Sequence, residues 1–120
     1  MTDPSPDELS RAFHALADPT RRDLVARLAA ADATVGSLAS HYEVSLQAVS
    51  KHVGVLERAG LVTKQSRGQQ RSVHLEAAVL HLMTRWIERY AGQLEQRYQR
   101  LDAVLAEQGD TPLPTQRSTP

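Results

Sequence analysis

The stretch that decides the fold is Ser45-Leu-Gln-Ala-Val-Ser-Lys-His-Val-Gly-Val-Leu-Glu-Arg-Ala-Gly60. Ser45 is a residue type that caps helix N-termini, and Gly60 stands where a glycine commonly ends a helix. Between them, apolar residues recur at spacings of three, four and three: Leu46, Val49, Val53 and Leu56. This spacing predicts an amphipathic helix over residues 46–59 with one buried stripe.

The opposite face of this predicted helix is polar and carries few acids. Its members are Gln47, Ala48, Ser50, Lys51, Gly54 and Arg58. Short side chains near the start of the helix, with a lysine beside them, allow close approach to a polyanion. The outer face is therefore the first candidate binding surface.

Three further helices are predicted upstream. Apolar residues at positions 9, 12, 13 and 16 lie on one helical face. Asp18 followed by Pro19 is typical of a helix start and predicts a helix over residues 19–30 that buries Leu24, Val25 and Leu28. Thr34 is expected to cap a short helix whose buried residues are Val35, Leu38, Ala39 and Tyr42. Residues 43–45 form the turn into the central helix.

Downstream the period changes from helical to alternating. Residues 61–65 and 71–75 carry β-branched residues around the sequence Arg67-Gly68-Gln69-Gln70, which predicts a hairpin with a basic tip. Residues 77–107 predict one long amphipathic helix. Its apolar stripe consists of Leu80, Met83, Ile87, Tyr90, Leu94, Tyr98, Leu101 and Leu105, with Trp86 beside it.

One subunit of this size does not cover so long an apolar face, so packing against a second copy is expected. Residues 1–107 are expected to form one domain. Residues 108–120, rich in Pro and Thr, are expected to be a disordered tail.

Charge is balanced over the chain but unevenly distributed. The 14 basic residues equal the 14 acidic ones, which argues against a polybasic tail. Residues 44–75, however, hold five basic residues and one acid, a net of +4, whereas residues 1–43 sum to −3 and residues 76–120 to −1. A basic segment between acidic flanks is an electrostatic footprint for phosphate.

The composition excludes several classes. The chain has no cysteine, so disulfides, thiolate metal sites and thiol redox switches are excluded. The N-terminal residues lack the basic and apolar regions of a secretory signal, and no apolar run is long enough to cross a membrane. The expected location is the cytoplasm.

The predicted class is mainly α with a small β-hairpin, in the order α-α-α-α-β-β-α. The short helix and its successor form a helix-turn-helix, and the hairpin lies where a wing follows that motif. In such a winged helix-turn-helix the second helix enters the major groove of double-stranded DNA. Lys64, Arg67 and Arg71 of the hairpin are then expected to reach flanking phosphates or the minor groove.

The sequence resembles the ArsR/SmtB-type winged helix-turn-helix repressors. The resemblance covers residues 9–105, and four segments in the right order carry it: Ala17-Asp-Pro-Thr-Arg-Arg22, Ser45-Leu-Gln-Ala-Val-Ser-Lys-His-Val53, Leu56-Glu-Arg-Ala-Gly-Leu-Val62 and Arg67-Gly68. It implies that residues 1–107 are a DNA-binding and dimerisation domain with a long C-terminal dimerisation helix. It also implies a homodimeric repressor that acts at a palindromic operator and in some cases on its own operon. The implied homodimer interface is built from the first and last helices and includes Phe13, Met83, Ile87, Tyr90 and Leu94. No regulated gene or inducer follows from the sequence.

The resemblance also implies roles for single residues. Gln47, Ser50 and Lys51 match the family's base-contacting positions, where glutamine pairs with adenine and lysine donates to guanine. Ser45 and His52 are expected at phosphates, and Arg67 and Arg71 match basic wing positions. The predicted DNA-binding set is Ser45, Gln47, Ala48, Ser50, Lys51, His52, Lys64, Arg67 and Arg71.

Structural roles compete with some of these interpretations. The basic residues of positions 44–75 would also suit a solvated surface, but their clustering on a helix-turn-helix and its wing favours DNA. Arg58 is excluded from the set because Glu57 and the helix C-terminus can satisfy it. Arg21 and Arg22 are expected to be exposed or paired with acids, without a DNA role.

Metal sensing occurs in many relatives of this type, yet the residues do not support it here. Their thiolate sites need cysteines, and the alternative Asp/His/Glu site in the last helix would find only His81 and Glu88, with alanine and valine at the leading positions. The five histidines form no i, i+4 pair. No metal and no cofactor is predicted. Trp86, Tyr90 and Tyr98 are assigned to the dimer core, with a pocket for an unidentified small-molecule effector as the alternative.

An enzyme is not predicted, since no phosphate loop, nucleophile elbow, zinc-protease motif or paired carboxylate is present. A winged helix that binds another protein is the stronger alternative, because folds host many functions. Such an interface would favour exposed aromatic or leucine side chains on the outer helix face. Gln47, Ser50 and Lys51 there suit a DNA groove instead.

Overall fold

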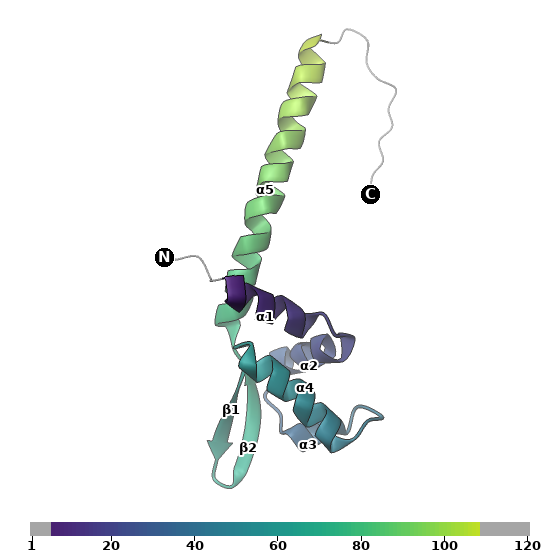
Figure 1. Ribbon diagram of the computed structural model, residues 1–120, viewed down its shortest axis with the longest axis vertical. Coiled ribbons are helices and arrows are strands. Elements are labelled where there is room, and N and C mark those ends of the chain that lie inside the picture. Colours follow the sequence, from purple (N-terminus) through teal and green to yellow (C-terminus); the bar gives the residue numbers. More distant parts are fainter. Residues whose placement is uncertain (1–5, 109–120) are drawn as a thin grey trace. The chain divides into compact units, whose positions relative to one another are not determined.

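The computed structural model describes residues 6–108 and divides into two compact units, one ending at Thr84 and one starting at Arg85. The first unit contains four helices, α1 (Pro6–Leu16), α2 (Pro19–Ala30), α3 (Val35–Ala39) and α4 (Leu46–Arg58), followed by strands β1 (Val62–Arg67) and β2 (Gln70–Leu75) (Figure 1). Helix α5 (Ala77–Gln108) begins in the first unit and continues through the second. The predicted mainly helical class with a hairpin wing is confirmed.

Three predicted N-caps start three of the helices. The Asp18 carboxylate accepts from the backbone N–H of Arg21 at 3.0 Å, and Pro19 follows at the first helical position. Thr34 Oγ1 accepts from the Ser37 N–H at 3.0 Å and begins α3. Ser45 Oγ accepts from the Ala48 N–H at 3.1 Å and begins α4. Each cap satisfies a backbone donor that the first turn leaves unpaired.

The core of the first unit lies between the helices and the hairpin. Its fully buried larger side chains are Leu24, Leu38, Val49, Val53, Leu56, Leu61, Val62 and Val73. The predicted stripe of α4 is thus buried at its second, third and fourth members. Leu46 corrects the prediction, since it is 54% exposed. It is the first residue of α4, one turn before the part of the helix that the core covers.

The helix-turn-helix is held to α2 by a small polar cluster. Helix α3 packs against α4, and Tyr42 in the turn between them donates its hydroxyl to Asp23 of α2. Arg27 pairs with the same carboxylate at 2.9 Å and lies 5.6 Å from the centre of the Tyr42 ring. Hydrogen bonds from Tyr42 and Arg27 lower the pKa of Asp23, while burial raises the pKa of the Tyr42 hydroxyl and keeps it a donor. The cluster therefore fixes the turn that leads into α4.

The hairpin is longer and its turn is tighter than predicted. Strands expected over 61–65 and 71–75 extend over 62–67 and 70–75, and the Arg67–Gln70 pair leaves only Gly68 and Gln69 in the turn. Gly68 has a φ of 62°, as a tight two-residue hairpin turn requires of its first residue. At the base, Ala33 and Val73 exchange two backbone hydrogen bonds of 3.3 and 2.7 Å, which tie the α2–α3 connection to β2.

Gly60 forms the joint between α4 and β1. It has a φ of 78°, and the helix ends at Arg58, one residue before the predicted Ala59. The N–H of Leu61 then donates to the Leu56 carbonyl at 2.9 Å, as in a helix end closed by a left-handed glycine. This turn directs the chain from α4 into the hairpin.

Helix α5 has different surroundings in the two units. Within the first unit, Val79 and Leu80 pack against the core and Met83 is only 5% exposed. In the second unit, the stripe is exposed: Trp86, Ile87, Tyr90, Leu94, Tyr98, Leu101, Val104 and Leu105. No helix within residues 6–108 is long and apolar enough to cross a membrane. The predicted tail falls on residues 109–120, outside the described part of the chain, apart from residue 108 at the end of α5.

Candidate nucleic-acid interface

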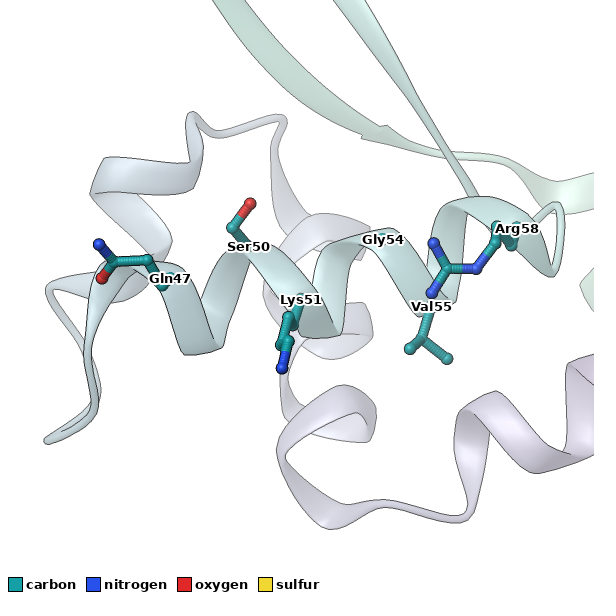
Figure 2. Close-up of a pocket in the computed structure, with 6 residues that line it drawn as sticks. All are labelled: Gln47, Ser50, Lys51, Gly54, Val55 and Arg58. Atoms are coloured by element: carbon teal, nitrogen blue, oxygen red, sulfur yellow. The ribbon is translucent and has the colours of Figure 1, made fainter.

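The outer face of α4 forms a shallow groove along one side of the helix. Figure 2 shows the six residues that line it: Gln47, Ser50, Lys51, Gly54, Val55 and Arg58. The structure thus brings together the three residues predicted to contact bases. They lie roughly opposite Val49, Val53 and Leu56, so burial of the apolar stripe leaves this face exposed.

The beginning of α4 adds two of the predicted residues. Ser45 is exposed, and its side-chain oxygen accepts a hydrogen bond from the Ala48 N–H. Its hydroxyl group can still donate a hydrogen bond to a ligand. Ala48 is half-buried beside the groove. The positive end of the helix dipole lies at this terminus and favours an anion there.

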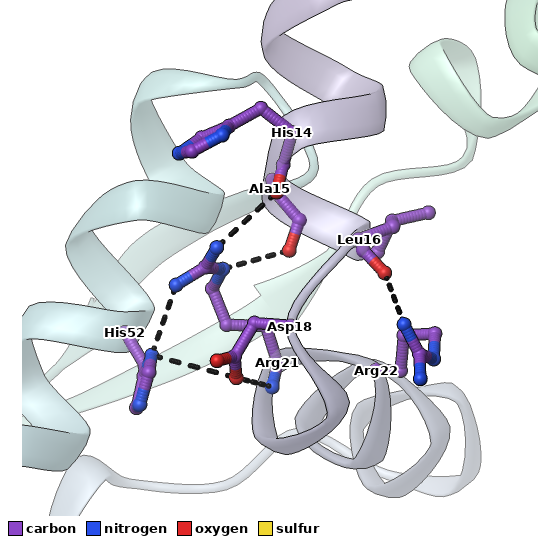
Figure 3. Close-up of polar contacts among 7 residues, drawn as sticks. All are labelled: His14, Ala15, Leu16, Asp18, Arg21, Arg22 and His52. Atoms are coloured by element: carbon purple, nitrogen blue, oxygen red, sulfur yellow. Dashed lines mark hydrogen bonds and ion pairs between the residues drawn. The ribbon is translucent and has the colours of Figure 1, made fainter.

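His52 points away from the groove, toward the turn between α1 and α2. Its Nδ1 lies 3.2 Å from Arg21 Nη1 and 4.0 Å from Asp18 Oδ2 (Figure 3). A guanidinium only donates, so Nδ1 is the acceptor in this contact. The structure therefore places His52 in the contact between α4 and the α1–α2 turn, and we do not propose it as a phosphate ligand.

Arg21 and Arg22 bind the end of α1 rather than acidic side chains. Arg21 donates to the carbonyl of Ala15 at 2.7 Å and to that of His14 at 3.2 Å, and Arg22 donates to the carbonyl of Leu16 at 2.8 Å. These contacts add donors to carbonyls in the last turn of α1, where intrahelical donors run out; the His14 carbonyl also accepts the Ala17 N–H at 3.1 Å. Both arginines were expected to be exposed or paired with acids. Arg22 is exposed, whereas Arg21 is partly buried and its guanidinium contacts backbone carbonyls and His52 instead of a carboxylate.

The basic residues of the hairpin are divided between two surroundings. Lys64 is partly buried, and its Nζ lies 3.7 Å from the carboxylate of Glu57 on α4. This pair fixes the base of the hairpin to α4 and partly neutralises the lysine. Arg67 and Arg71 are exposed near the turn.

The register shows that Arg67 and Arg71 belong to opposite faces of the hairpin. Arg71 pairs with Ser66 and so shares a face with Lys64 and Val73, whereas Arg67 pairs with Gln70 on the other face. Val73 is buried, and Lys64 contacts α4, so the Arg71 face is the one that adjoins α4. The hairpin therefore offers one arginine to an anion on each of its two faces.

Residues that hold metals do not gather in the part of the chain described. No three His, Cys, Asp or Glu residues lie close enough there to bind one ion. His74 pairs with Asp32 at 2.9 Å, which links β2 to the loop after α2. That pair gives the histidine a structural role.

Three groove residues are absent from the predicted set: Gly54, Val55 and Arg58. Gly54 and Arg58 were recognised as outer-face residues, yet Arg58 was assigned to Glu57 as a partner. In the structure Glu57 pairs with Lys64 instead. The sequence signal that identifies Arg58 is its separation from Gln47, because eleven residues bring the helix back to the same side.

Comparison with known proteins agrees with this geometry. A family described as a helix-turn-helix domain matches residues 16–65. Transcriptional repressor SdpR of Bacillus subtilis is 30% identical over 79 residues, which cover 66% of this chain and 88% of that protein. HTH-type transcriptional regulator Rv2034 of Mycobacterium tuberculosis is 42% identical over 86 residues, which cover 72% of this chain and 78% of that protein.

A solved structure shares both the sequence and the fold. The ArsR-like transcriptional regulator from Rhodococcus sp. RHA1 superimposes with a TM-score of 0.70 at 31% identity, over 88% of this chain and 96% of that one. The relatives are regulators of transcription, and none of those named is an enzyme. The chain, with its helix-turn-helix and hairpin wing, belongs to the ArsR family of DNA-binding transcriptional regulators.

Proposed function

We propose that the protein is a homodimeric repressor that binds a palindromic operator through α4 and the hairpin. The observation that carries this is the outer groove of α4, where Gln47, Ser50 and Lys51 lie together without an acidic side chain. In a dimer the two α4 helices would enter successive major grooves about 34 Å apart.

Within each half-site we assign different tasks to α4 and to the hairpin. Gln47 and Lys51 have the donors and acceptors that read base edges in the major groove, and Ser50 lies between them. Ser45 at the helix start, with Arg67 and Arg71 on the hairpin, is assigned to the phosphate backbone. Ala48 is assigned no hydrogen bond to DNA, because its N–H already donates to Ser45, and its small side chain lets DNA approach the helix start. Backbone contacts supply affinity and base contacts supply sequence preference. Lys64 is assigned to the base of the wing, where its pair with Glu57 leaves a weaker phosphate contact.

The division of tasks is tested on an operator selected from randomised duplexes. Gln47→Ala with Lys51→Ala should bring operator affinity down to that for random DNA while most salt-dependent binding remains. Arg67→Ala should weaken both duplexes alike and reduce the salt slope by about one unit for each phosphate that the arginine binds. Equal behaviour of the two variants on operator and random DNA would refute the assignment.

Dimerisation is proposed through the exposed stripe of α5, together with α1. Ile87, Tyr90 and Leu94 of the predicted interface are exposed at 49%, 47% and 45%, and Phe13 on α1 is exposed at 36%. Met83 is a correction, because it is buried in the core of its own subunit and offers little surface to a partner. The rings of Trp86 and Tyr90 lie 5.0 Å apart and extend the apolar surface.

Two variants on opposite sides of α5 test this interface. Leu94→Glu places a charge in the stripe, and Gln96→Glu places one on the far side of the helix, about 200° away. Sedimentation equilibrium should show a dimer for the parent and for Gln96→Glu and a monomer for Leu94→Glu. A monomeric parent at micromolar concentration would exclude the dimer.

Regulation is proposed to be independent of metal ions. The absence of cysteine and the lack of any cluster of three suitable side chains over residues 6–108 support this. Operator binding should not change when Zn²⁺, Ni²⁺, Co²⁺ or Cu²⁺ is added at micromolar concentration. Release of the operator by one of these ions would overturn the proposal.

A further inference from the structure

Arg58, at the last turn of α4, continues the line of side chains that begins with Gln47. The two residues are eleven apart, so at about 100° per residue they differ by only about 20° around the helix, and they are about 16 Å apart along its axis. Both line the same groove, with Lys51 and Gly54 between them (Figure 2). The face that α4 presents to a ligand is therefore about three turns long.

The charge of Arg58 is not neutralised by the neighbouring acid. Glu57, the adjacent carboxylate, is directed to Lys64 of β1, with 3.7 Å between the charged atoms. Among the residues that the structure describes, Arg58 has neither an ion pair nor a hydrogen bond from its side chain. An exposed guanidinium without a carboxylate is free to bind an external anion.

Gly54 leaves room beside this guanidinium. Glycine destabilises a helix interior relative to alanine. Its backbone here has no positive φ that would require glycine. A Cβ at position 54 would meet no core atom: its neighbours would be the Arg58 guanidinium nitrogens, at 3.5 and 4.0 Å. Packing within the protein therefore does not require glycine at position 54. Close approach of a ligand backbone, such as the sugar–phosphate chain of DNA, would require it.

We propose that Arg58 binds a phosphate of the DNA backbone across Gly54, so that the last turn of α4 clamps the DNA that its first turn reads. This inference rests on the proposed DNA binding through α4 and adds a contact to it. The guanidinium of Arg58 can form charged hydrogen bonds to a phosphate. Lys64 is less suited to this contact because its charge is already paired with Glu57. Gly54 acts as a positioning residue that lets the sugar–phosphate chain come close to the helix.

A salt titration on a random-sequence duplex measures phosphate contacts without knowledge of the operator. The full-length parent is compared with Arg58→Ala, Arg58→Lys and the control Arg85→Ala, which removes one charge from α5 on the side opposite Leu94. Each phosphate that a variant no longer binds should lower the slope of log K against log salt by about 0.9. For a dimer, Arg58→Ala should therefore lower the slope by nearly two units, Arg58→Lys should keep most of the slope, and Arg85→Ala should match the parent.

Gly54→Ala tests the close approach separately. Alanine favours the helix, so the midpoint of thermal unfolding should rise by a few degrees while duplex affinity falls at least several-fold. A stabilised variant that binds less well cannot be explained by misfolding. Unchanged affinity in Gly54→Ala would overturn the role of Gly54.

The outcomes separate this inference from the function on which it rests. An unchanged slope in Arg58→Ala, with normal salt-dependent binding of the parent, would refute the phosphate contact alone. A parent without salt-dependent duplex binding would refute the proposed function itself.

Discussion

Arg21 makes more structural contacts than its place in a basic pair of residues indicates. One guanidinium donates to the carbonyls of His14 and Ala15 and contacts His52 of α4, while the backbone N–H of the same residue is capped by Asp18. Three helices therefore meet at one side chain. A substitution there should affect the fold before it affects any DNA contact.

Arg21→Ala is expected to lower the free energy of unfolding by about 1–3 kcal/mol, because partly buried carbonyls lose a charged donor. Chemical denaturation at a fixed protomer concentration measures the loss. Arg85→Ala removes the same charge from the exposed part of α5 and should change stability by less than about 0.5 kcal/mol. Equal stability of the two variants would contradict this role of Arg21.

Asp18 should make stability depend on acid pH. The hydrogen bond from the Arg21 backbone N–H is the main cause that lowers the pKa of this carboxylate, and the positive charge of the Arg21 guanidinium lowers it further. A lowered pKa in the folded state means that the unfolded chain takes up the proton first. The stabilisation is complete above the ordinary aspartate pKa of about 3.9 and is lost as the pH falls through the folded pKa.

Asp18→Asn keeps a good N-cap but removes the titration. Its free energy of unfolding should fall less steeply than that of the parent between about pH 5 and pH 3. Asp102→Asn on α5 is the control and should follow the parent curve. Parallel curves for the parent and Asp18→Asn would show that the cap does not favour the ionised form.

Among single residues, the sequence predicted the contacts between near neighbours in the chain and missed those between distant residues. The caps at Asp18, Thr34 and Ser45 depend on residues three apart and were predicted correctly. The partners of Arg21, His52 and Lys64 lie across turns or on other elements, so no spacing rule identifies them. The sequence therefore identified these charged and polar residues without showing that their side chains already have partners within the protein.

Within residues 6–108, two glycines have a positive φ, and they lie at the joints that follow α4 and β1. Gly60 lies between α4 and β1, and a Cβ there would stand 3.1 Å from Val79 Cγ2. Gly68 lies at the hairpin turn, where a Cβ would meet nothing within 4 Å. The same substitution thus meets a steric obstacle at one position and only a backbone penalty at the other.

Gly68→Ala is expected to cost roughly 1–2 kcal/mol, the penalty of a left-handed conformation for a residue with a Cβ. Gly60→Ala should cost more, because Val79 must also move. Thermal unfolding of both variants gives the order. Gly68→Asn is the control, and it should recover part of the loss because asparagine tolerates this conformation. A reversed order would mean that the α4–β1 joint relaxes freely.

Element ends were harder to predict than elements. All seven elements occur in the predicted order. The four longer helices span more than ten residues, whereas the shorter α3, β1 and β2 were predicted from the cap at Thr34 and from β-branched residues around a glycine turn. The hairpin strands run through Ser66, Arg67 and Gln70, polar residues without an apolar partner in the pattern. Backbone pairing continues there because the two-residue turn fixes the register, and this turn is a property of two strands together.

For the molecule as a whole, thermal stability should depend on concentration if α5 completes its packing with a second copy. Dimer formation stabilises the folded state by mass action. The unfolding temperature of the parent should rise by roughly 3–6 °C for each tenfold increase in protomer concentration. Leu94→Glu should remove this dependence and Gln96→Glu should keep it. A parent with a constant unfolding temperature would indicate that the exposed stripe does not associate.

The sequence predicted one continuous apolar stripe along α5, but in the structure the stripe has a buried part and an exposed part. Met83 belongs to the core of the first unit, whereas Ile87, one turn later, is half exposed. Periodicity alone gives both residues the same face of the helix. Where the subunit's own core ends depends on the helices and hairpin that pack there, which the period of α5 does not contain.

The two hydrogen bonds between Ala33 and Val73 also set how the wing fluctuates. They join the hairpin base to the loop after α2, next to the buried side chain of Val73. Opening at the base therefore requires the core to open with it, whereas the exposed turn around Gly68 can open alone. In hydrogen exchange the amides of Ala33 and Val73 would exchange their protons only as slowly as the core does, and those near Gly68 much faster. In the proposed DNA contact, the hairpin would therefore offer a tip that can open locally on a base that opens only together with the core.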